Sequence, residues 1–394
     1  MRWREIPVEA RRYILYHTMV SPLLISWHML PVYMFMTGYS VLEVGVLFTV
    51  VSVASIPTTY LVGRVFERCA VRHGLVAIDL LEAAAYFAYG LACGPVAPVA
   101  LFTGLILEEV SGVLYPLYQV AERLLYPQDR VEEVLTWHMR LPVLSQLAGF
   151  LSLGYIFGHV LTSPHHYRVG FMALGASSVG AAAYLIRALP KMGGGRRLTE
   201  ELEFRFDREF ALILAVEALT AAAWGLAPSI VLLNYVINVL GLTLFEAMVV
   251  EAVVSLGALA ATYIAEKVPR EQRFLAISIG YALISAWALV MALSPPFTLV
   301  LTAYFTLELG STLMFPFYRG WLFSKIPESK ASSILASISS YRRLISLLTP
   351  GAAGYLAYLS PTLPYLASLI VFIAAAALFT VVHQWKQASN QEAT

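Results

Sequence analysis

The sequence predicts an all-α integral membrane protein in which twelve transmembrane helices form two pseudo-symmetric six-helix bundles. Of the 394 residues, 59% are hydrophobic and only 13% are charged, whereas a soluble globular chain carries roughly a quarter charged residues. The mean hydropathy is +0.72. Apolar runs recur from end to end and are long enough to cross a hydrocarbon core of about 30 Å as helices. An internal repeat separates six of these runs from the other six.

The apolar runs are continuous and rich in Leu, Ala, Val and Gly, which favours helices over the alternating strands of a barrel. The first run is too long for the apolar region of a signal peptide, and no cleavage-site pattern precedes a soluble domain. The expected spans are 12–36, 41–65, 75–93, 97–124, 134–160, 167–188, 209–239, 243–266, 273–292, 296–324, 331–359 and 362–384.

The positions of the 26 Lys and Arg residues predict the orientation, because basic residues are retained on the cytoplasmic side. Nearly all of them lie in or beside the two terminal tails and the even-numbered breaks, and Arg168 alone lies in an odd-numbered break. We therefore expect a multi-pass protein of the plasma membrane with both termini in the cytoplasm. Three basic residues lie deeper inside predicted helices than the others: Arg140, Arg342 and Arg343.

Charge and motif content exclude several classes of function. A formal net charge of +1 gives no basic surface of the kind that binds nucleic acid. The two cysteines are expected on opposite sides of the membrane, so they cannot form a disulfide with each other. The sequence has no P-loop, no H-E-x-x-H and no Cys/His cluster of metal-site spacing. We expect no metal site, no cofactor and no enzymatic activity, and a monomer whose partners are the lipid bilayer and a small molecule.

The two halves of the chain are repeats. When the sequence is shifted by 200 residues, LEEVSGVLYPLY (107–118) falls on LELGSTLMFPFY (307–318), and from there to residue 155 eleven of 49 positions are identical, where chance in this composition gives about four. The expected domains are an N-terminal bundle (1–189), a Gly-rich and then charged cytoplasmic linker (190–208) and a C-terminal bundle (209–394). A short surface helix within the linker is a further expectation.

Parallel six-helix repeats of this kind resemble the major facilitator superfamily. The break after the second span, GRVFERCAVRHG (63–74), resembles the superfamily pattern G-x-x-x-D-R-x-G-R-[RK]. Gly63, Arg68 and Arg72 match the pattern, and Glu67 replaces its aspartate. The corresponding stretch of the second half, AEKVPREQR (265–273), is a poorer match, with the charges of Arg270 and Glu271 exchanged.

The resemblance implies a conformational latch formed by the same four residues. Gly63 would let the end of helix 2 approach a neighbour closely, while Glu67, Arg68 and Arg72 would pair across the cytoplasmic faces of the two halves. Glu67 would face the N-terminus of helix 11, where the helix dipole favours an anion. The alternative is an ordinary positive-inside loop.

Ionisable residues inside the spans are candidates for function, because a charge at bilayer depth costs at least about 2.5 kcal/mol. The acids outnumber the three arginines. Asp79 and Glu82 lie on helix 3, which is peripheral in the superfamily, so local pairing is expected for them. The acids in the spans are Asp79, Glu82, Glu108, Glu109, Glu217, Glu251 and Glu308.

Glu108 and Glu308 occupy equivalent positions in helices 4 and 10, which line the central cavity in the superfamily. One interpretation makes them proton carriers, or ligands for a cationic or hydroxylated substrate, because a dry cavity favours the protonated acid. The other pairs Glu108 with Arg140, and Glu308 with Arg342 or Arg343. Glu109 lies about 100° further round its helix and is expected to pack against helix 2 or 5.

Three polar residues complete the candidate site. His28 lies midway along helix 1, where a titratable ring could relay protons or could bond neighbouring helices. Asn234 and Asn238 lie four residues apart on helix 7, so they share a face and could bind a substrate or hold helices together. Gly149, Gly154 and Gly158 and the PGAAG segment (350–354) allow close helix packing.

The resemblance and these residues predict a secondary active transporter that moves a small molecule by alternating access, coupled to protons. Efflux of a hydrophobic or cationic compound is favoured by the excess of acids and by aromatic residues in the spans. Uptake of a sugar or organic anion is favoured by the arginines. A transport-inactive sensor on the same fold is a third possibility, because fold does not fix function.

Overall fold

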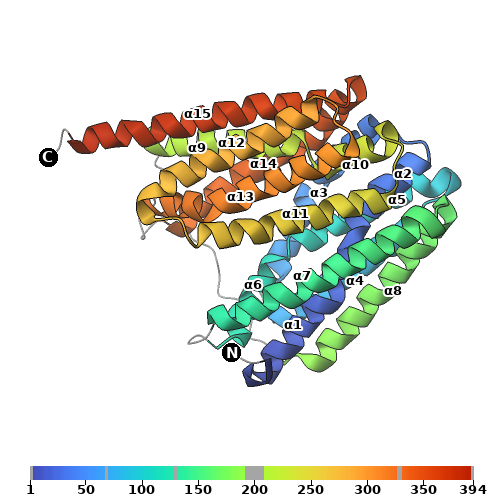
Figure 1. Cartoon of the computed structure of the whole chain (residues 1–394). Coiled ribbons are helices and arrows are strands. Elements are labelled where there is room, and N and C mark those ends of the chain that lie inside the picture. The colour runs from blue at the N-terminus through green and yellow to red at the C-terminus, as the bar shows by residue number, and fades with distance from the viewer. Residues whose placement is uncertain (1–2, 67–69, 128–130, 191–207, 326–330, 392–394) are drawn as a thin grey trace. The chain divides into compact units, whose positions relative to one another are not determined.

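The computed structural model describes residues 3–66, 70–127, 131–190, 208–325 and 331–391 (Figure 1). Within these ranges the regular structure is helical and contains no β-strand. The all-helical class predicted from the sequence is therefore confirmed. The expected linker falls almost wholly at 191–207, outside the described residues, and so does the surface helix expected in it.

The first half of the chain contains eight α-helices among the described residues. A 3₁₀ turn (Ser21–Ile25) separates the first two, and a π-helical turn (Ile156–Val160) follows the seventh. The α-helices are α1 (Val8–Val20), α2 (Ser26–Met36), α3 (Val41–Phe66), α4 (Val71–Leu91), α5 (Ala97–Gly112), α6 (Pro116–Leu125), α7 (Val131–Tyr155) and α8 (Pro164–Ala188).

The second half contains seven α-helices in the part of the chain that the structure describes. A π-helical turn (Tyr235–Val239) follows the second of them. The helices are α9 (Arg208–Leu226), α10 (Ser229–Asn234), α11 (Leu244–Ala265), α12 (Arg273–Ala292), α13 (Phe297–Lys325), α14 (Ala331–Leu359) and α15 (Leu363–Gln391).

Eleven segments of the described chain are helices long and apolar enough to cross a membrane, and they coincide with eleven of the twelve expected spans. The remaining expected span, 331–359, lies on α14, where the apolar part, Leu344–Leu359, is shorter than in the other eleven. The first part of α14 is polar and carries Arg342 and Arg343. The helix count is thus close to the expected twelve.

Prolines explain why three expected continuous spans are interrupted. Pro22 is the second residue of the 3₁₀ turn between α1 and α2, Pro116 begins α6 after a break at residues 113–115, and Pro228 lies between α9 and α10. Proline has no N–H to donate and its ring clashes with the preceding turn, so a helix ends or bends before it. Composition alone predicted the length of these spans but not the interruptions.

The chain forms two compact units. The first unit contains Met1–Tyr39, Val50–Leu198 and Thr243–Met248, and the second contains Ser40–Thr49, Thr199–Leu242 and Val249–Thr394. The units therefore follow the two sequence halves except that each takes one short segment from the other half. The expected boundaries at 189 and 209 remain a prediction.

Glycines make the contacts that place these two short segments. In the second unit, a Cβ atom on Gly45 would meet the Pro350 carbonyl oxygen and would lie 3.1 Å from the Gly354 Cα. In the first unit, a Cβ atom on Gly154 would lie 2.6 Å from the Met248 Cγ. The glycines of helix 5 and of the PGAAG segment thus allow close helix packing, as the sequence predicts.

Each unit has its own buried core. In the first unit, α4 packs against α5 and α8, and α1 packs against α7 and α8. In the second, α12 packs against α13 and α15, and α9 packs against α14 and α15. Tyr13 and Tyr16 are fully buried in the first core, and Trp287 and Phe372 in the second.

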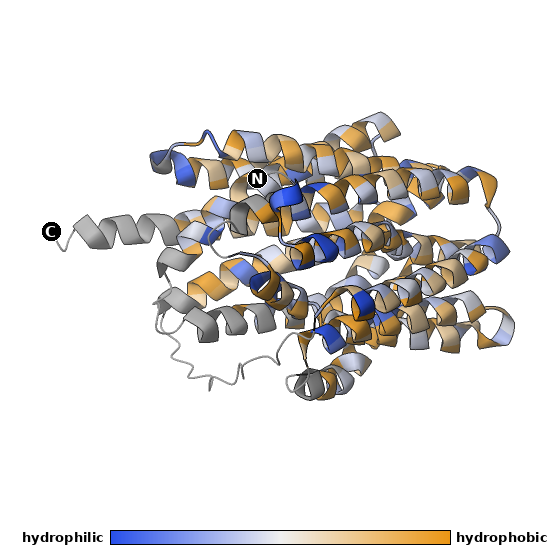
Figure 2. Ribbon diagram, turned by 90° about the horizontal axis from the view of Figure 1, so that it is seen from below, coloured by the Kyte–Doolittle hydropathy of each residue, from blue (hydrophilic) through white to orange (hydrophobic). Residues whose placement is uncertain are grey.

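Large apolar side chains also remain on the surface of the helices. Leu61 is 62% exposed, Leu144 62% and Ile370 60%. Figure 2 shows hydrophobic positions along the helices with hydrophilic ones between them. Such exposure is unfavourable in water and is expected where the surrounding solvent is lipid.

Candidate functional site

Three carboxylates in the first unit are each hydrogen-bonded by a tyrosine. Tyr16 donates to Asp79 Oδ1 at 2.8 Å, and Tyr115 donates to Glu82 Oε1 at 2.9 Å. Tyr89 of α4 donates to Oε2 of Glu108, which lies on the next helix, at 2.7 Å. Asp79 and Glu82 lie on α4, three residues apart and therefore on one face, and Glu108 lies on α5. We call Asp79, Glu82, Glu108 and their three tyrosines the acidic row.

The acidic row contains no cation within the described part of the chain. Among these residues, no Lys, Arg or His lies within ion-pair distance of Asp79, Glu82 or Glu108. Asp79 is only 2% exposed, and Glu82 interacts electrostatically with both of the other acids. Asp79 is buried, and Glu82 and Glu108 are partly buried, so carboxylates this close to one another favour a bound proton or an external cation over three unpaired negative charges.

Glu109 faces a different helix from its neighbour Glu108. Its Oε1 atom accepts a hydrogen bond of 2.9 Å from Ser52 on α3. The two glutamates diverge as the helical step of about 100° requires. The contact with α3 agrees with the expected packing of Glu109 against helix 2.

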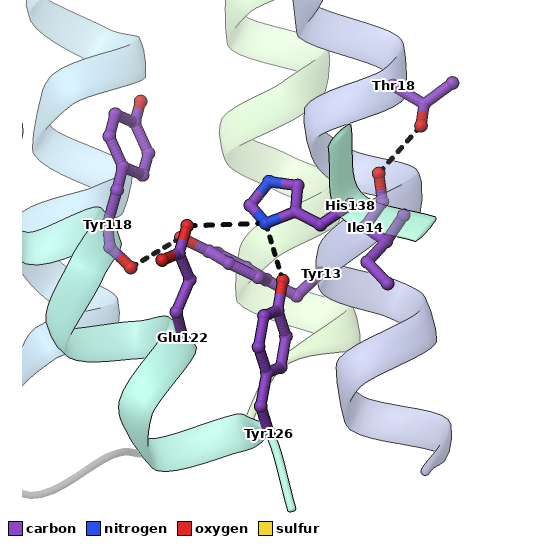
Figure 3. A network of polar contacts seen from close by, with 7 residues as sticks. All are labelled: Tyr13, Ile14, Thr18, Tyr118, Glu122, Tyr126 and His138. Carbon is purple, nitrogen blue, oxygen red and sulfur yellow. Dashed lines mark hydrogen bonds and ion pairs between the residues drawn. The ribbon is translucent and has the colours of Figure 1, made fainter. Parts of the chain in front are cut away.

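A second polar cluster of the first unit centres on His138 of α7. Figure 3 shows Glu122 and Tyr126 approaching the same ring nitrogen, Nδ1, at 3.3 and 2.7 Å. In the same view Tyr13 donates to the carbonyl oxygen of Tyr118 at 3.0 Å. These residues come from α1, α6 and α7, so the cluster joins three helices.

The second unit contains a different arrangement around Glu217 of α9. Its side chain is 6% exposed and lies 3.8 Å from Arg342 Nε, measured from Oε2. Tyr318 of α13 donates to Oε1 at 2.9 Å. Arg342 is 53% exposed at its side chain, so this is a buried acid with a half-exposed cation beside it.

Glu308 accepts a hydrogen bond from its own helix. Thr312, one turn further along α13, donates to Oε1 at 2.6 Å. A Cβ atom on Gly257 of α11 would lie 3.3 Å from the Glu308 Cβ, and Glu251 of α11 interacts with Glu308 electrostatically. Glu308 therefore lies against α11.

Two of the predicted acid–arginine pairs, Glu108 with Arg140 and Glu308 with Arg342, do not form among the described residues, and the third, Glu308 with Arg343, stays a prediction. Glu108 is bonded to Tyr89 rather than to Arg140, which is exposed. Arg342 lies beside Glu217 and not Glu308, while the side chain of Arg343 is outside the described part of the chain. The two pairings that the described residues test were wrong, because spacing along one helix does not reveal which neighbouring helix a side chain faces. The placement of Glu108 and Glu308 toward a cavity stays a prediction.

The remaining site candidates are found in separate places. His28 is 7% exposed and packs edge-on against Phe150 at a ring-centroid distance of 5.6 Å. In the second unit, Asn238 Nδ2 donates to Asn234 Oδ1 at 3.0 Å. The two asparagines share a face, as expected, and satisfy part of each other's hydrogen bonding.

The expected latch is described only in part. Glu67 and Arg68 lie outside the described residues, and Gly63 lies near the end of α3. Arg72 Nη1 donates to the carbonyl oxygens of Leu189 at 3.0 Å and Ile186 at 3.4 Å. A cation at these carbonyls stabilises the C-terminus of α8.

Sequence reasoning missed the acidic row because it treated Asp79 and Glu82 as peripheral acids with local partners. Their partners are tyrosines of α1 and of the break before α6. One signal was available: Asp79, Glu82, Tyr86 and Tyr89 recur on one face of α4 at helical spacing. Tyrosines interleaved with acids on a buried face indicate a hydrogen-bonded network rather than a lipid-facing surface.

Among the described residues, no group of three or more His, Cys, Asp and Glu side chains is arranged to hold a metal ion. The acidic row instead offers carboxylate oxygens and phenol hydroxyls, which bind protons or small cations.

Residues 17–350 match the family model described as Major Facilitator Superfamily. Comparison with the sequences of curated proteins finds no significant match.

Solved structures share the fold at low sequence identity. A bacterial homologue of the iron transporter ferroportin, in its inward-facing state, matches with a TM-score of 0.76 at 11% identity over 97% of this chain and 99% of that one. A bacterial metal transporter matches with a TM-score of 0.72 at 14% identity over 96% and 99%. The nucleoside transporter NupG matches with a TM-score of 0.66 at 13% identity over 95% and 98%. These likenesses establish the twelve-helix transporter fold.

Proposed function

The chain belongs to the Major Facilitator Superfamily, and we propose that it is a proton-coupled secondary active transporter that exports a hydrophobic or cationic compound by alternating access. Membership makes it a multi-pass membrane transporter and not an enzyme. The substrate, the direction and the coupling ion belong to the proposal.

The acidic row is the observation that supports proton coupling. Asp79, Glu82 and Glu108 lie in membrane-spanning helices, each with a tyrosine donor and none with a basic partner among the described residues. A carboxylate without a cation in low dielectric binds a proton more readily. Exposure to the two sides of the membrane in turn then lets such a group load and release that proton.

The same excess of negative charge favours a cationic substrate. An anion would meet several carboxylates in the first unit, and like charges at low dielectric repel by several kcal/mol. Glu308 and Glu251 add acids to the second unit. Two of the matched structures are described as metal or iron transporters, so a metal ion is included among the cations to be tested.

Uptake of a sugar or organic anion is the alternative, and it relies on the arginines. Arg342 has its guanidinium beside Glu217, which partly neutralises it, and Arg140 is exposed. Both features weaken this alternative. An anion binding to Arg342 would have to compete with Glu217.

We further propose the topology and the latch that the sequence predicts. Both termini lie in the cytoplasm, the protein acts as a monomer in the plasma membrane, and the bundles comprise residues 1–189 and 209–394. Gly63, Glu67, Arg68 and Arg72 close the cytoplasmic side. Arg72 donates a hydrogen bond to the Leu189 carbonyl oxygen at the end of α8. This contact would fix the latch residues to the first unit.

Transport of ethidium, a fluorescent organic cation, into vesicles tests the proposal. Reconstituted protein should accumulate ethidium when the vesicle interior is acidic, and a protonophore should abolish the accumulation. The double variant Glu108→Gln, Glu308→Gln keeps shape and hydrogen bonding but cannot titrate, so it should lose accumulation while its unfolding midpoint stays unchanged. Glu109→Gln is the matched control, because Glu109 faces Ser52 on another helix.

Two results would count against the proposal. Accumulation by the double variant against a gradient would end the proton-carrier role and leave both glutamates as structural residues. No accumulation by the unsubstituted protein would exclude export of this class of cation. A thermal-shift screen against sugars, organic anions and metal ions would then separate the uptake alternative from a transport-inactive sensor, which binds a ligand without moving it.

A further inference from the structure

Two hydrogen-bonded groups of residues lie close together in the first unit without being joined. In the first, Tyr118 and Tyr16 have their hydroxyl oxygens 3.4 Å apart, and Tyr16 donates to Asp79. In the second, Tyr126 and Glu122 flank Nδ1 of His138 (Figure 3). The first group contains an acid of the acidic row. The second lies at the end of the unit that the predicted topology places in the cytoplasm.

His17 of α1 lies between the two groups. Its ring centroid is 4.9 Å from that of Tyr118 and 4.6 Å from that of His138. Its Nε2 atom is buried and has no hydrogen-bond partner among the described residues. Asp79 Oδ2, at the far end of the first group, is also buried without a partner there. Buried polar atoms are nearly always paired, and both of these atoms lie beside one network, where each is available for a further hydrogen bond.

We propose that His17 carries protons between the two groups, so that the first unit has its own proton path from Glu122 and His138 to Asp79. The inference rests on the proposed function, because it names the route by which the coupling proton would reach the acidic row. It assigns a role to residues of α1, α6 and α7 that lie within one unit.

The path balances as a series of single proton transfers. A proton taken up at His138 passes to one ring nitrogen of His17, and the proton on the other ring nitrogen leaves to the Tyr118 oxygen. Tyr118 gives its own proton to the Tyr16 oxygen, and Tyr16 gives its proton to Asp79. Each phenol and each imidazole ends with the number of protons it began with, and only Asp79 is converted from carboxylate to neutral acid.

The path needs the His17 side chain to rotate so that its nitrogens reach His138 and Tyr118, whose rings it already contacts. The other transfers follow existing contacts: Tyr16 already donates to Asp79 at 2.8 Å. A ring placed against both Tyr118 and His138 can hydrogen-bond to them in turn, because its two nitrogens lie on different sides of the ring.

The rings that contact His17 belong to groups that can exchange protons. Helix α8, which also packs against α1, contributes Tyr184, whose hydroxyl donates to the Arg12 carbonyl. The titratable groups facing this region are Tyr13 and Tyr16 of α1, Asp79 and Glu82 of α4, Tyr115 before α6, Tyr118 and Glu122 of α6, Tyr126 after α6 and His138 of α7.

A purely structural histidine is the competing explanation. His17 makes edge contacts with Tyr13, at 4.6 Å, and with Tyr16, at 5.1 Å between ring centroids. Phenylalanine would fill the same space and keep these ring contacts. The two explanations therefore differ in the rate of proton exchange at Asp79 and not in stability.

Time-resolved infrared spectroscopy after a pH jump measures this rate in the protein in lipid nanodiscs. The Asp79 carboxyl band is assigned by its loss in Asp79→Asn. His17→Phe should slow the change of that band by about 100-fold, as expected for removal of a positioned proton donor and acceptor, without altering its final amplitude. His73→Phe is the matched control, because His73 is exposed at the start of α4, and it should exchange at the parent rate.

A second variant covers the case in which His17→Phe does not fold. Tyr118→Phe removes the next hydroxyl of the path and should slow the same band. An unchanged rate in the folded variant overturns the proposal, and so does an Asp79 that exchanges no proton over the pH range in which the protein stays folded.

The experiment uses no substrate, so its outcome is separate from that of the ethidium test. Proton-driven ethidium transport together with parent-rate exchange in His17→Phe would retain the transporter proposal and reject this path. Slowed exchange in His17→Phe without ethidium transport would retain the path and reject the proposed substrate.

Discussion

Helices α4 and α5 of the first half and helices α12 and α13 of the second half occupy equivalent places in the repeat. The two pairs are joined in different ways. In the first unit, Tyr89 of α4 bonds Glu108 of α5 at 2.7 Å. In the second, Gly280 of α12 and Gly310 of α13 face each other so closely that a Cβ atom on either would lie 2.8 Å from the other's carbonyl oxygen. Helix α4 carries two acids and α12 carries none. The first pair therefore combines a hydrogen bond with the close packing of Gly104 of α5 against the Tyr89 ring, whereas the second pair is joined through the backbone of two glycines.

Equivalent tyrosines show the same contrast. Tyr118 of the first unit meets Tyr16 and His17 of α1, whereas Tyr318 of the second meets Glu217 of α9, which also has Arg342 beside it. The first arrangement can gain and lose protons without a fixed cation. The second holds a charged pair and is suited to a constant structure. The comparison shows that the two equivalent tyrosines have different kinds of partner, uncharged rings and a hydroxyl in the first unit and an acid beside an arginine in the second.

The largest effect should come from filling the contact between α12 and α13. Gly310→Leu places its side chain against the Gly280 carbonyl, the Leu283 Cβ at 2.8 Å and the Ile284 amide. Most of these are backbone atoms or atoms next to the backbone, which cannot turn aside. Overpacking of this kind costs about 3 kcal/mol in the free energy of unfolding, measurable by SDS titration in mixed micelles.

Gly320→Leu is the control on the same helix. A Cβ atom there meets nothing within 4 Å, so the variant gains the helix propensity of leucine without a clash. It should be as stable as the parent or slightly more stable. Equal stability of Gly310→Leu and Gly320→Leu would show that α12 and α13 do not pack closely.

Most of the fold could be predicted from the sequence because hydrophobic length determines a membrane span directly. The interruptions at Pro22, Pro116 and Pro228 lie beside prolines, which favour the end of a helix. Proline alone does not predict them, because Pro316, the repeat equivalent of Pro116, lies inside α13. The reduced apolar length of α14 was not predicted, because its polar first part carries Arg342 and Arg343 within a run that is apolar on average.

The candidate site was predictable only in part. The repeat singled out Glu108 and Glu308 as equivalent positions, but their partners, Tyr89 and Thr312, differ. Partner choice depends on the rotation of each helix and on which neighbour it meets, and neither follows from spacing in one sequence. His17 was missed because nothing along α1 distinguishes a buried histidine between two networks from one that faces lipid.

A smaller effect is expected from removing the hydroxyl that holds Glu108. Tyr89→Phe keeps the buried ring but leaves the carboxylate without a donor, which costs about 2 kcal/mol for a hydrogen bond to a charged group. Adding Glu108→Leu should recover most of this loss, because both partners are then absent. SDS unfolding of the single and double variants measures both values.

Tyr304→Phe in the second unit is the matched control. Its hydroxyl lies 3.4 Å from that of Tyr365, a long contact between neutral groups. Its removal should cost less than the removal of the Tyr89 hydroxyl. A larger loss of stability in Tyr304→Phe than in Tyr89→Phe would contradict a strong hydrogen bond between Tyr89 and Glu108. A Tyr89→Phe variant whose stability is not recovered by adding Glu108→Leu would contradict it as well.

The smallest effect should be the coupling between Glu217 and Arg342. The two side chains approach to 3.8 Å, and the arginine is 53% exposed, so solvent screens the attraction and the side chain loses entropy by staying in place. A double-mutant cycle with Glu217→Gln and Arg342→Gln should therefore give a coupling free energy below about 1 kcal/mol. The cycle of Glu217→Gln with Tyr318→Phe should give more, because that 2.9 Å bond is short and its acceptor is buried. A coupling to Arg342 that exceeded the coupling to Tyr318 would mean that the pair is more deeply enclosed than its exposure indicates. The ion pair of Glu217 and Arg342 would then contribute more to the stability of the second unit than its exposure predicts.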